Sequence, residues 1–174
     1  MTGLGRLFRD QRAAAAAEMA LVFPLLLIIG LAGVEVGNYF LDEHRLVKAV
    51  RDGARYAARQ DFSNYSGCNG TAADVPTALK NNVKAIVQQG VLSGGSDLLA
   101  NWNSATFTVQ MTCTSTAGSQ TLGGIYTDTS GAAPPAVVIV TATVPYAPSA
   151  ISGYGFKARG YNLYARQQAA VMGV

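Results

Sequence analysis

The chain has 174 residues, with 13 Lys and Arg, 10 Asp and Glu, and a formal net charge of +3. A hydrophobic N-terminal segment stands apart from a remainder of roughly 110–130 residues, which is one modest domain with a small core. Residues 85–156 contain only two charged side chains, Asp97 and Asp128. Because a nucleic-acid interface needs clustered Lys and Arg, this distribution excludes nucleic acid from the expected partners.

The N-terminal segment predicts a membrane-spanning helix. A basic leader containing Arg6, Arg9 and Arg12 precedes an apolar run, Met19 to Val34, that carries no charge. Residues 14–34 would form about 31 Å of helix at about 1.5 Å per residue, which matches a bilayer hydrocarbon core of about 30 Å.

Two residues are unusual in this segment. Glu18 places a carboxylate in an otherwise apolar helix, and hydrocarbon around such a group costs about 2.5–3.5 kcal/mol. An ionisable residue in such a position is therefore a functional hypothesis by default. Pro24 removes one backbone hydrogen bond and invites a kink, which membrane helices tolerate.

A secretory signal is the alternative interpretation of the same segment. A basic n-region, an apolar h-region and small residues at Gly30 and Ala32 are typical of a cleaved signal. Against it, the apolar run over 19–34 is long for an h-region, and the helical pattern continues past Ala32. In this alternative the chain is a signal-anchored or secreted extracytoplasmic ligand-binding domain.

The helical pattern continues to about Arg59. Apolar residues recur at three- and four-residue steps, as in an amphipathic helix, and Glu43 interrupts their stripe. The stripe consists of Val36, Tyr39, Phe40, Leu46, Val47, Val50, Ala54, Ala57 and Ala58. We therefore expect a basic leader over 1–13, a transmembrane and amphipathic helix over 14–60, and an extracytoplasmic α+β domain over 61–174.

A short helix follows a turn-rich segment. Residues 61–74 contain many Ser, Asn and Gly residues and predict a loop. Asp74 as the cap and Pro76 in the first turn predict the start of a helix, and Gly94-Gly95 predict its end. Its apolar face would consist of Leu79, Val83, Ile86 and Val87.

Three later segments predict strands. Residues 105–114 alternate between apolar and polar without error, which predicts a half-buried strand. Residues 136–144 are apolar at nearly every position, which predicts a central strand covered on both faces. Residues 157–171 predict a weaker last strand. The expected fold class is α+β, with a long N-terminal transmembrane helix continuing into a small antiparallel β-sheet domain.

The two cysteines, Cys68 and Cys113, lie in the polar part of the chain. They are too few for a disulfide scaffold, and their spacing fits no metal site. In an oxidising compartment they would form one bridge, worth about 4 kcal/mol by the chain-entropy argument. In a reducing compartment they would be two buried thiols. The low-charge, Ser/Thr/Gly-rich composition favours the bridge and an exported domain, while basic residues on both sides of the apolar run leave the orientation by charge open.

No catalytic constellation stands out. His44 is the only histidine and lies among charged neighbours on the juxtamembrane helix, whereas a triad or a metal site needs partners that the chain lacks. Gly94-Gly95 and Gly123-Gly124 lack the Lys-Ser/Thr of a phosphate-binding loop. We therefore expect no enzyme, no metal and no cofactor.

Three blocks in the first sixty residues resemble the TadE-like proteins, which are minor pilins or pseudopilins of the tight-adherence (Flp) pilus system. The blocks are RAAAAAEMALVFPLLL at 12–27, VEVGNY at 34–39 and RDGARYAA at 51–58. They follow one another in the order and at the distances of the family. Beyond them, the resemblance is limited to the plan of a helix followed by strands, and it implies a pilin-like fold.

The resemblance implies cleavage by a prepilin peptidase between Ala13 and Ala14. Ala14 would become the N-terminus and Glu18 its fifth residue; the family usually has Gly where this chain has Ala13. The freed α-amine of one subunit could pair with Glu18 of a neighbour, which offsets the desolvation of both charges and requires a defined axial register. We therefore expect Glu18, together with Pro24, to serve assembly.

The resemblance also implies partners and a location. The partners would be other pilins and pseudopilins of the same pilus, the prepilin peptidase, the inner-membrane assembly platform and the membrane itself. The chain would cross the bacterial inner membrane once, with its N-terminus cytoplasmic and its C-terminal domain periplasmic, and could enter a cell-surface pilus. Its function would be a part in assembling a tight-adherence type IV pilus used for surface adhesion.

Overall fold

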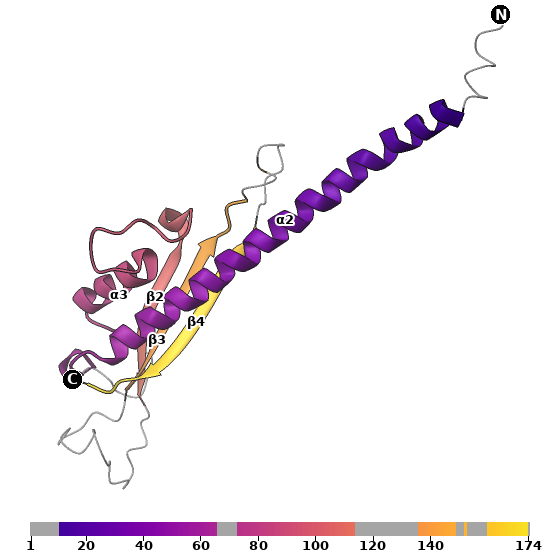
Figure 1. Ribbon diagram of the computed structural model, residues 1–174. Helices are drawn as coiled ribbons and strands as arrows, with labels where there is room; N and C mark the ends of the chain where they lie inside the picture. The colour runs from indigo at the N-terminus through magenta and orange to yellow at the C-terminus, as the bar shows by residue number, and fades with distance from the viewer. Residues whose placement is uncertain (1–10, 66–72, 114–135, 149–151, 153–159, 174) are drawn as a thin grey trace, which may run out of the picture. The chain divides into compact units, whose positions relative to one another are not determined.

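The computed structural model describes residues 11–65, 73–113, 136–148, 152 and 160–173 (Figure 1), of which the side chains of 11–13, 113 and 136 are not described. Its elements are helix α2 (Gln11–Ala58), the 3-10 turn η1 (Phe62–Tyr65), strand β1 (Ala73–Asp74), helix α3 (Thr77–Gln89), the 3-10 turn η2 (Trp102–Ser104), and strands β2 (Thr106–Cys113), β3 (Ala136–Pro145) and β4 (Asn162–Ala170). The four strands form one antiparallel sheet in the order β1-β2-β3-β4. The predicted α+β class is confirmed.

The chain divides into two compact units. The first comprises Met1–Asn38 and Pro148–Lys157, and the second comprises Tyr39–Ala147 and Ala158–Val174. Helix α2 contributes to both, because its residues up to Asn38 belong to the first unit and the rest to the second.

In the first unit, α2 presents its apolar side chains to the outside. Leu21 is 79% exposed, and residues 14–30 are exposed without exception. Within the described part of the chain, α2 is the one helix long and apolar enough to cross a membrane, with a mean hydropathy of 2.4 in its most apolar window. Its length, composition and exposure fit a membrane anchor near the N-terminus.

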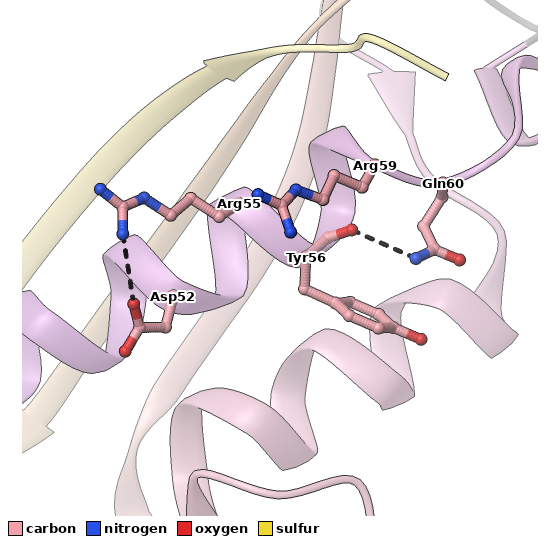
Figure 2. Close-up of a pocket in the computed structure, with 5 residues that line it drawn as sticks. All are labelled: Asp52, Arg55, Tyr56, Arg59 and Gln60. Carbon is pink, nitrogen blue, oxygen red and sulfur yellow. Dashed lines mark hydrogen bonds and ion pairs between the residues drawn. The ribbon is translucent and has the colours of Figure 1, made fainter. Parts of the chain in front are cut away.

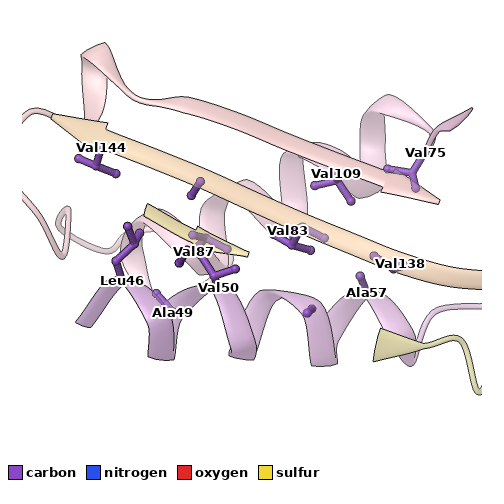
Figure 3. Close-up of a cluster of buried hydrophobic side chains, with 14 of the residues drawn as sticks. Leu46, Ala49, Val50, Ala57, Val75, Val83, Val87, Val109, Val138 and Val144 are labelled. Atoms are coloured by element: carbon purple, nitrogen blue, oxygen red, sulfur yellow. The ribbon is translucent and has the colours of Figure 1, made fainter. Parts of the chain in front are cut away.

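In the second unit, the other end of α2 packs against one face of the sheet. Figure 3 shows this cluster, in which side chains of α2 and α3 lie against the strands. Its buried members include Leu46, Val50, Ala54 and Ala57 from α2, Leu79, Val83 and Val87 from α3, Val109 and Met111 from β2, Val138, Val140, Ala142 and Val144 from β3, and Leu163 and Ala165 from β4. The three- and four-residue spacing on the helices and the spacing of two on the strands place these apolar residues on facing surfaces.

The two strongest strand predictions are confirmed in position, and one is wrong in detail. The segment predicted at 105–114 forms β2, and the segment predicted at 136–144 forms β3, which is an interior strand. Strand β3 is covered on one face only: its even-numbered residues from Val138 to Val144 are buried, whereas the odd-numbered ones from Val137 to Thr143 are half-buried. Because α2 and α3 contribute to the same core, the opposite face of β3 has no helix over it in the described residues. The last strand is shorter than the predicted 157–171.

The segment between the helices differs from its prediction as well. Asp74 does not cap α3 but pairs with Gln110 across β1 and β2, and Pro76 is the N-cap residue. The helix ends at Gly90, whose φ of 76° is the left-handed conformation that glycine adopts without strain, and not at Gly94-Gly95. The turn η1 lies within the segment that was predicted as a loop, and Cys68 falls outside the described residues.

Tyr65 ties the end of α2 to the turn that follows it. The Tyr65 hydroxyl donates a 2.6 Å hydrogen bond to the carbonyl oxygen of Ala57, one of the last carbonyls of the helix, which have no partner within it. Tyr65 is 2% exposed, and this burial raises the pKa of its hydroxyl above the ordinary value. The buried phenol therefore stabilises the helix end only while it remains protonated.

Replacing Gly53 by alanine should destabilise the second unit. A Cβ at Gly53 would lie 2.5 Å from Cγ2 of Val87 and 3.3 Å from Cγ1 of Val83, so α2 and α3 would have to move apart. We expect Gly53→Ala to lower the free energy of unfolding by about 1–3 kcal/mol, measured by thermal unfolding of the full chain in detergent. Gly37→Ala is the matched control, because nothing lies within 4 Å of that Cβ position. A Gly53→Ala protein that melts at or above the wild-type temperature would contradict the close packing.

The Tyr65 hydrogen bond predicts a dependence of stability on high pH. At pH 7, Tyr65→Phe should lower the free energy of unfolding by about 0.5–1.5 kcal/mol, because the Ala57 carbonyl loses the hydroxyl donor and keeps only the Gln60 amide, which donates to it at 3.1 Å. The folded-state pKa is raised above the unfolded value of about 10, so this contribution is complete below pH 10 and is lost above it, at up to about 1.4 kcal/mol per pH unit. Urea denaturation of both proteins between pH 7 and 11 should show their difference shrinking above pH 10, and a constant difference would contradict this account.

Candidate functional site

The predicted processing and assembly residues lie at the start of α2, in the first unit. Ala13 and Ala14 are both helical, and Ala14 is exposed. Glu18 follows Ala14 by four residues, so the two lie on the same face of the helix, one turn apart. The Glu18 side chain is exposed, and no hydrogen bond or ion pair joins it to another described residue. Pro24 is also exposed and lies inside α2, whose helical conformation continues on both sides of it.

Glu35 is a second carboxylate of the same helix that sequence reasoning did not single out. It is 8% exposed, and among the described residues it is the one charged side chain that is buried. It is not unpaired, because it takes part in an interaction within the fold. The signal that could have identified it is its position directly after the apolar run that ends at Val34, where a charge is costly unless it has a partner.

In the second unit, α2 is bonded to the outer edge of β4. The Tyr39 hydroxyl donates to the carbonyl oxygen of Asn162 at 3.3 Å, and the Tyr164 amide donates to Oε2 of Glu43 at 3.3 Å. Glu43 was predicted only as an interruption of the apolar stripe. The structure explains why a charged residue lies at this position. The Glu43 carboxylate accepts a hydrogen bond from the Tyr164 N–H, which points away from β3.

The solvent-facing side of α2 carries a shallow hollow near its C-terminal end. Figure 2 shows its five lining residues, Asp52, Arg55, Tyr56, Arg59 and Gln60, and its volume is about 520 Å³. Arg55 lies 4.0 Å from the Asp52 carboxylate, and the Gln60 side-chain amide donates to the Tyr56 carbonyl at 3.2 Å. Two arginines side by side can bind an anion.

The remaining predicted residues have these positions. His44 is exposed on α2. Within the described residues, no three His, Cys, Asp or Glu side chains gather in a way that could hold a metal ion. Cys68 lies outside the described residues and the side chain of Cys113 is not described, so their disulfide stays a prediction.

Residues 13–55 match the family model of the TadE-like proteins. The resemblance noted from the sequence is thereby confirmed over this segment, which contains Ala13, Glu18, Pro24 and Glu35. The match supports a protein associated with the tight-adherence pilus system. It ends within the second half of α2, so the sheet lies outside it. Neither the curated proteins nor the solved structures gave a match.

Proposed function

We propose that this protein is a minor pilin that takes part in the assembly of a tight-adherence pilus, and that it works by assembly and not by catalysis. The observation that carries the proposal is a coincidence of two features in α2. The segment that matches the TadE-like family, residues 13–55, contains the exposed apolar stretch over 14–30 and the one carboxylate of that stretch, Glu18. A membrane anchor alone needs the apolar residues but has no use for the carboxylate.

Processing would occur between Ala13 and Ala14. A prepilin peptidase that cleaves this bond removes the basic leader and leaves a new α-amine at Ala14, one helical turn before Glu18. The mature helix then begins with a positive charge followed closely by a negative one, and both lie at the end of an apolar segment. Each charge is costly in hydrocarbon until it is paired.

Pairing between subunits would offset the desolvation free energy of both charges. The α-amine of one subunit would donate a hydrogen bond to the Glu18 carboxylate of its neighbour, so that each charge compensates the other. This pairing would also set how far one helix is displaced along the other. In support, Glu18 is exposed and has no partner among the described residues, so it is available to another chain. The adjacent helix surface is apolar and exposed as well, and Gly30 and Gly33 have open space around them that allows another helix to approach closely.

The proposed location follows from the same helix. The chain would cross the inner membrane once, with its N-terminus on the cytoplasmic side and the sheet domain in the periplasm, where Cys68 and Cys113 could form a disulfide. Its partners would be other pilins of the same pilus, the prepilin peptidase and the assembly platform of the inner membrane.

Replacement of Glu18 tests the assembly role. We expect Glu18→Ala and the isosteric Glu18→Gln to enter the membrane at wild-type levels, because both increase the apolar character of the segment. Both should be depleted at least about tenfold from purified pili, since a lost buried charge pair costs about 3–5 kcal/mol. Membrane fractionation and immunoblotting of sheared pili measure the two quantities.

Met19→Ala is the matched control, because it changes an exposed apolar neighbour without touching the carboxylate. This control should assemble normally. Pili that contain Glu18→Gln at the wild-type level would refute the assembly role and favour the alternative in which residues 1–60 are an exchangeable anchor for a binding domain.

A further inference from the structure

The outer edge of β4 is closed at both ends and open between them. At its start, Asn162 and Tyr164 bond to α2 as described above, and beyond its end the Met172 amide donates to the Ala58 carbonyl at 2.8 Å. The residues that bond to α2, namely Asn162, Tyr164 and Met172, are all even-numbered. The odd-numbered Tyr161 bonds in the opposite direction, because its carbonyl accepts the amide N–H of Tyr146, the residue that follows β3. The N–H and C=O groups of the even-numbered residues therefore point away from β3.

The same alternation fixes the direction of the groups between these ends. The backbone N–H and C=O of Arg166, Gln168 and Ala170 point to the outer edge. Within the described chain, these three residues lie opposite β3 in non-hydrogen-bonded pairs, and they make no other hydrogen bond. All three are exposed. Three consecutive outward positions thus present free donors and acceptors, which is the arrangement that an added strand uses.

Two arginines at the C-terminal end of α2 lie beside this edge: Arg55 is in the helix, and Arg59 follows its last residue. Arg55 and Arg59, with Ala58 between them, line a hollow of about 410 Å³ whose other wall consists of Ala169, Ala170 and Met172. Met172 is 47% exposed, so the hollow offers apolar surface next to the guanidinium groups. In Figure 2 both arginine side chains extend back along α2 toward Asp52.

The charge around the hollow is positive and only weakly compensated. All basic residues on the solvent-facing side of α2 from Arg45 onward are exposed, namely Arg45, Lys48, Arg51 and Arg55, and so is Arg59 directly after the helix. Among the described residues, the ion pairs on this side are surface i,i+3 contacts, Arg45–Asp42 at 2.9 Å and Arg55–Asp52 at 4.0 Å, and such pairs contribute little. Arg59 has no ion pair with a described residue.

A membrane surface does not explain the two arginines at the hollow. Leu41 is the last exposed large apolar residue of α2, and Arg55 follows it by fourteen residues, or about 21 Å along the helix at about 1.5 Å per residue. A headgroup layer is only about 5–8 Å thick, and charges farther apart than about 8 Å are screened at physiological salt. Arg55 and Arg59 are therefore placed to meet a partner outside the bilayer.

We propose that the stretch Arg166–Ala170 of β4 binds an extended, acidic segment of a partner protein, which adds a fifth strand to the sheet. Its backbone pairs with the open edge, its carboxylates pair with Arg55 and Arg59, and its apolar side chains contact Met172. An acidic peptide fits these features better than a free anion does, because only a peptide uses the backbone edge, the charges and the apolar wall together. The proposal concerns the second unit and holds independently of the role of Glu18.

The test uses the full chain in nanodiscs of neutral phosphatidylcholine. The probe is a fluorescein-labelled peptide, acetyl-Thr-Glu-Val-Glu-Val-Glu-Thr-amide, which presents its carboxylates on one side of a strand, and its Gln counterpart is the control peptide. We expect the Glu peptide to bind at least about tenfold more tightly than the Gln peptide by fluorescence anisotropy, and to weaken severalfold between low and high salt. Addition of the Glu peptide should also slow hydrogen exchange of the Arg166, Gln168 and Ala170 amides.

Variants test the contribution of the arginine charges separately from that of the β4 backbone. The double variant Arg55→Gln/Arg59→Gln should lose at least about tenfold in affinity, whereas Lys48→Gln, which lines a different hollow on the same helix, should bind as the wild type does. Gln168→Pro should lose as much without any change of charge, since proline removes an outward N–H that β3 does not use.

Three results would overturn the proposal. The first is equal binding of the Glu and Gln peptides, and the second is no added protection of the three amides at peptide concentrations up to about 5 mM. The third is a loss of peptide binding when phosphatidylglycerol replaces the neutral lipid, because the arginines would then be occupied by headgroups. The exchange measurement on the wild-type chain decides the backbone contact even where Gln168→Pro fails to fold.

Discussion

The packing of the C-terminal half of α2 against one face of the antiparallel sheet is the interaction on which the second unit depends. Leu46, Val50 and Ala57 are fully buried in this contact, and Gly53 allows α3 to lie close to the same helix. Burial of a Leu or Val side chain contributes about 1.5–3 kcal/mol, so these few positions hold a small domain together. The N-terminal half of the same helix is equally apolar but exposed, and its apolar surface therefore needs a different environment.

This contrast within one continuous helix connects the fold to the proposed role. A soluble domain cannot leave a helix as apolar as residues 14–30 in water, so either lipid or other helices must cover it. In the proposed function, lipid would cover this segment before assembly, and neighbouring subunits would cover it in the fibre. In this proposal, the charge pair that includes Glu18 would distinguish a correctly aligned neighbour from any other apolar surface.

Much of the fold was predictable because it follows local periodicity. Strand β2 has an unbroken period of two, and the helical stripe of α2 identifies the side that packs on the sheet. The one-sided covering of β3 was not predictable, because an uninterrupted apolar run does not tell how many of its faces are covered. The end of α3 was misplaced because Gly90, which closes the helix, lacks the second glycine that made Gly94-Gly95 conspicuous.

In the candidate site, too, local sequence predicts some residues, whereas others depend on contacts between distant parts of the chain. Glu18 was identifiable because a charge in an apolar run is visible in one dimension, and the family match covers it. The role of Glu43 and the open edge beside Arg55 depend on which residues of β4 face α2, and this pairing joins positions more than one hundred residues apart. No local pattern carries such information, and the family match ends before the sheet begins.

The most direct measurement is the intact mass and N-terminal sequence of the protein recovered from membranes of its native host. The account predicts a mature chain that begins at Ala14 and retains all residues from there onward. A chain that begins near Gly33, as after cleavage of a secretory signal, would contradict it, and so would a chain that keeps its basic leader in assembled pili.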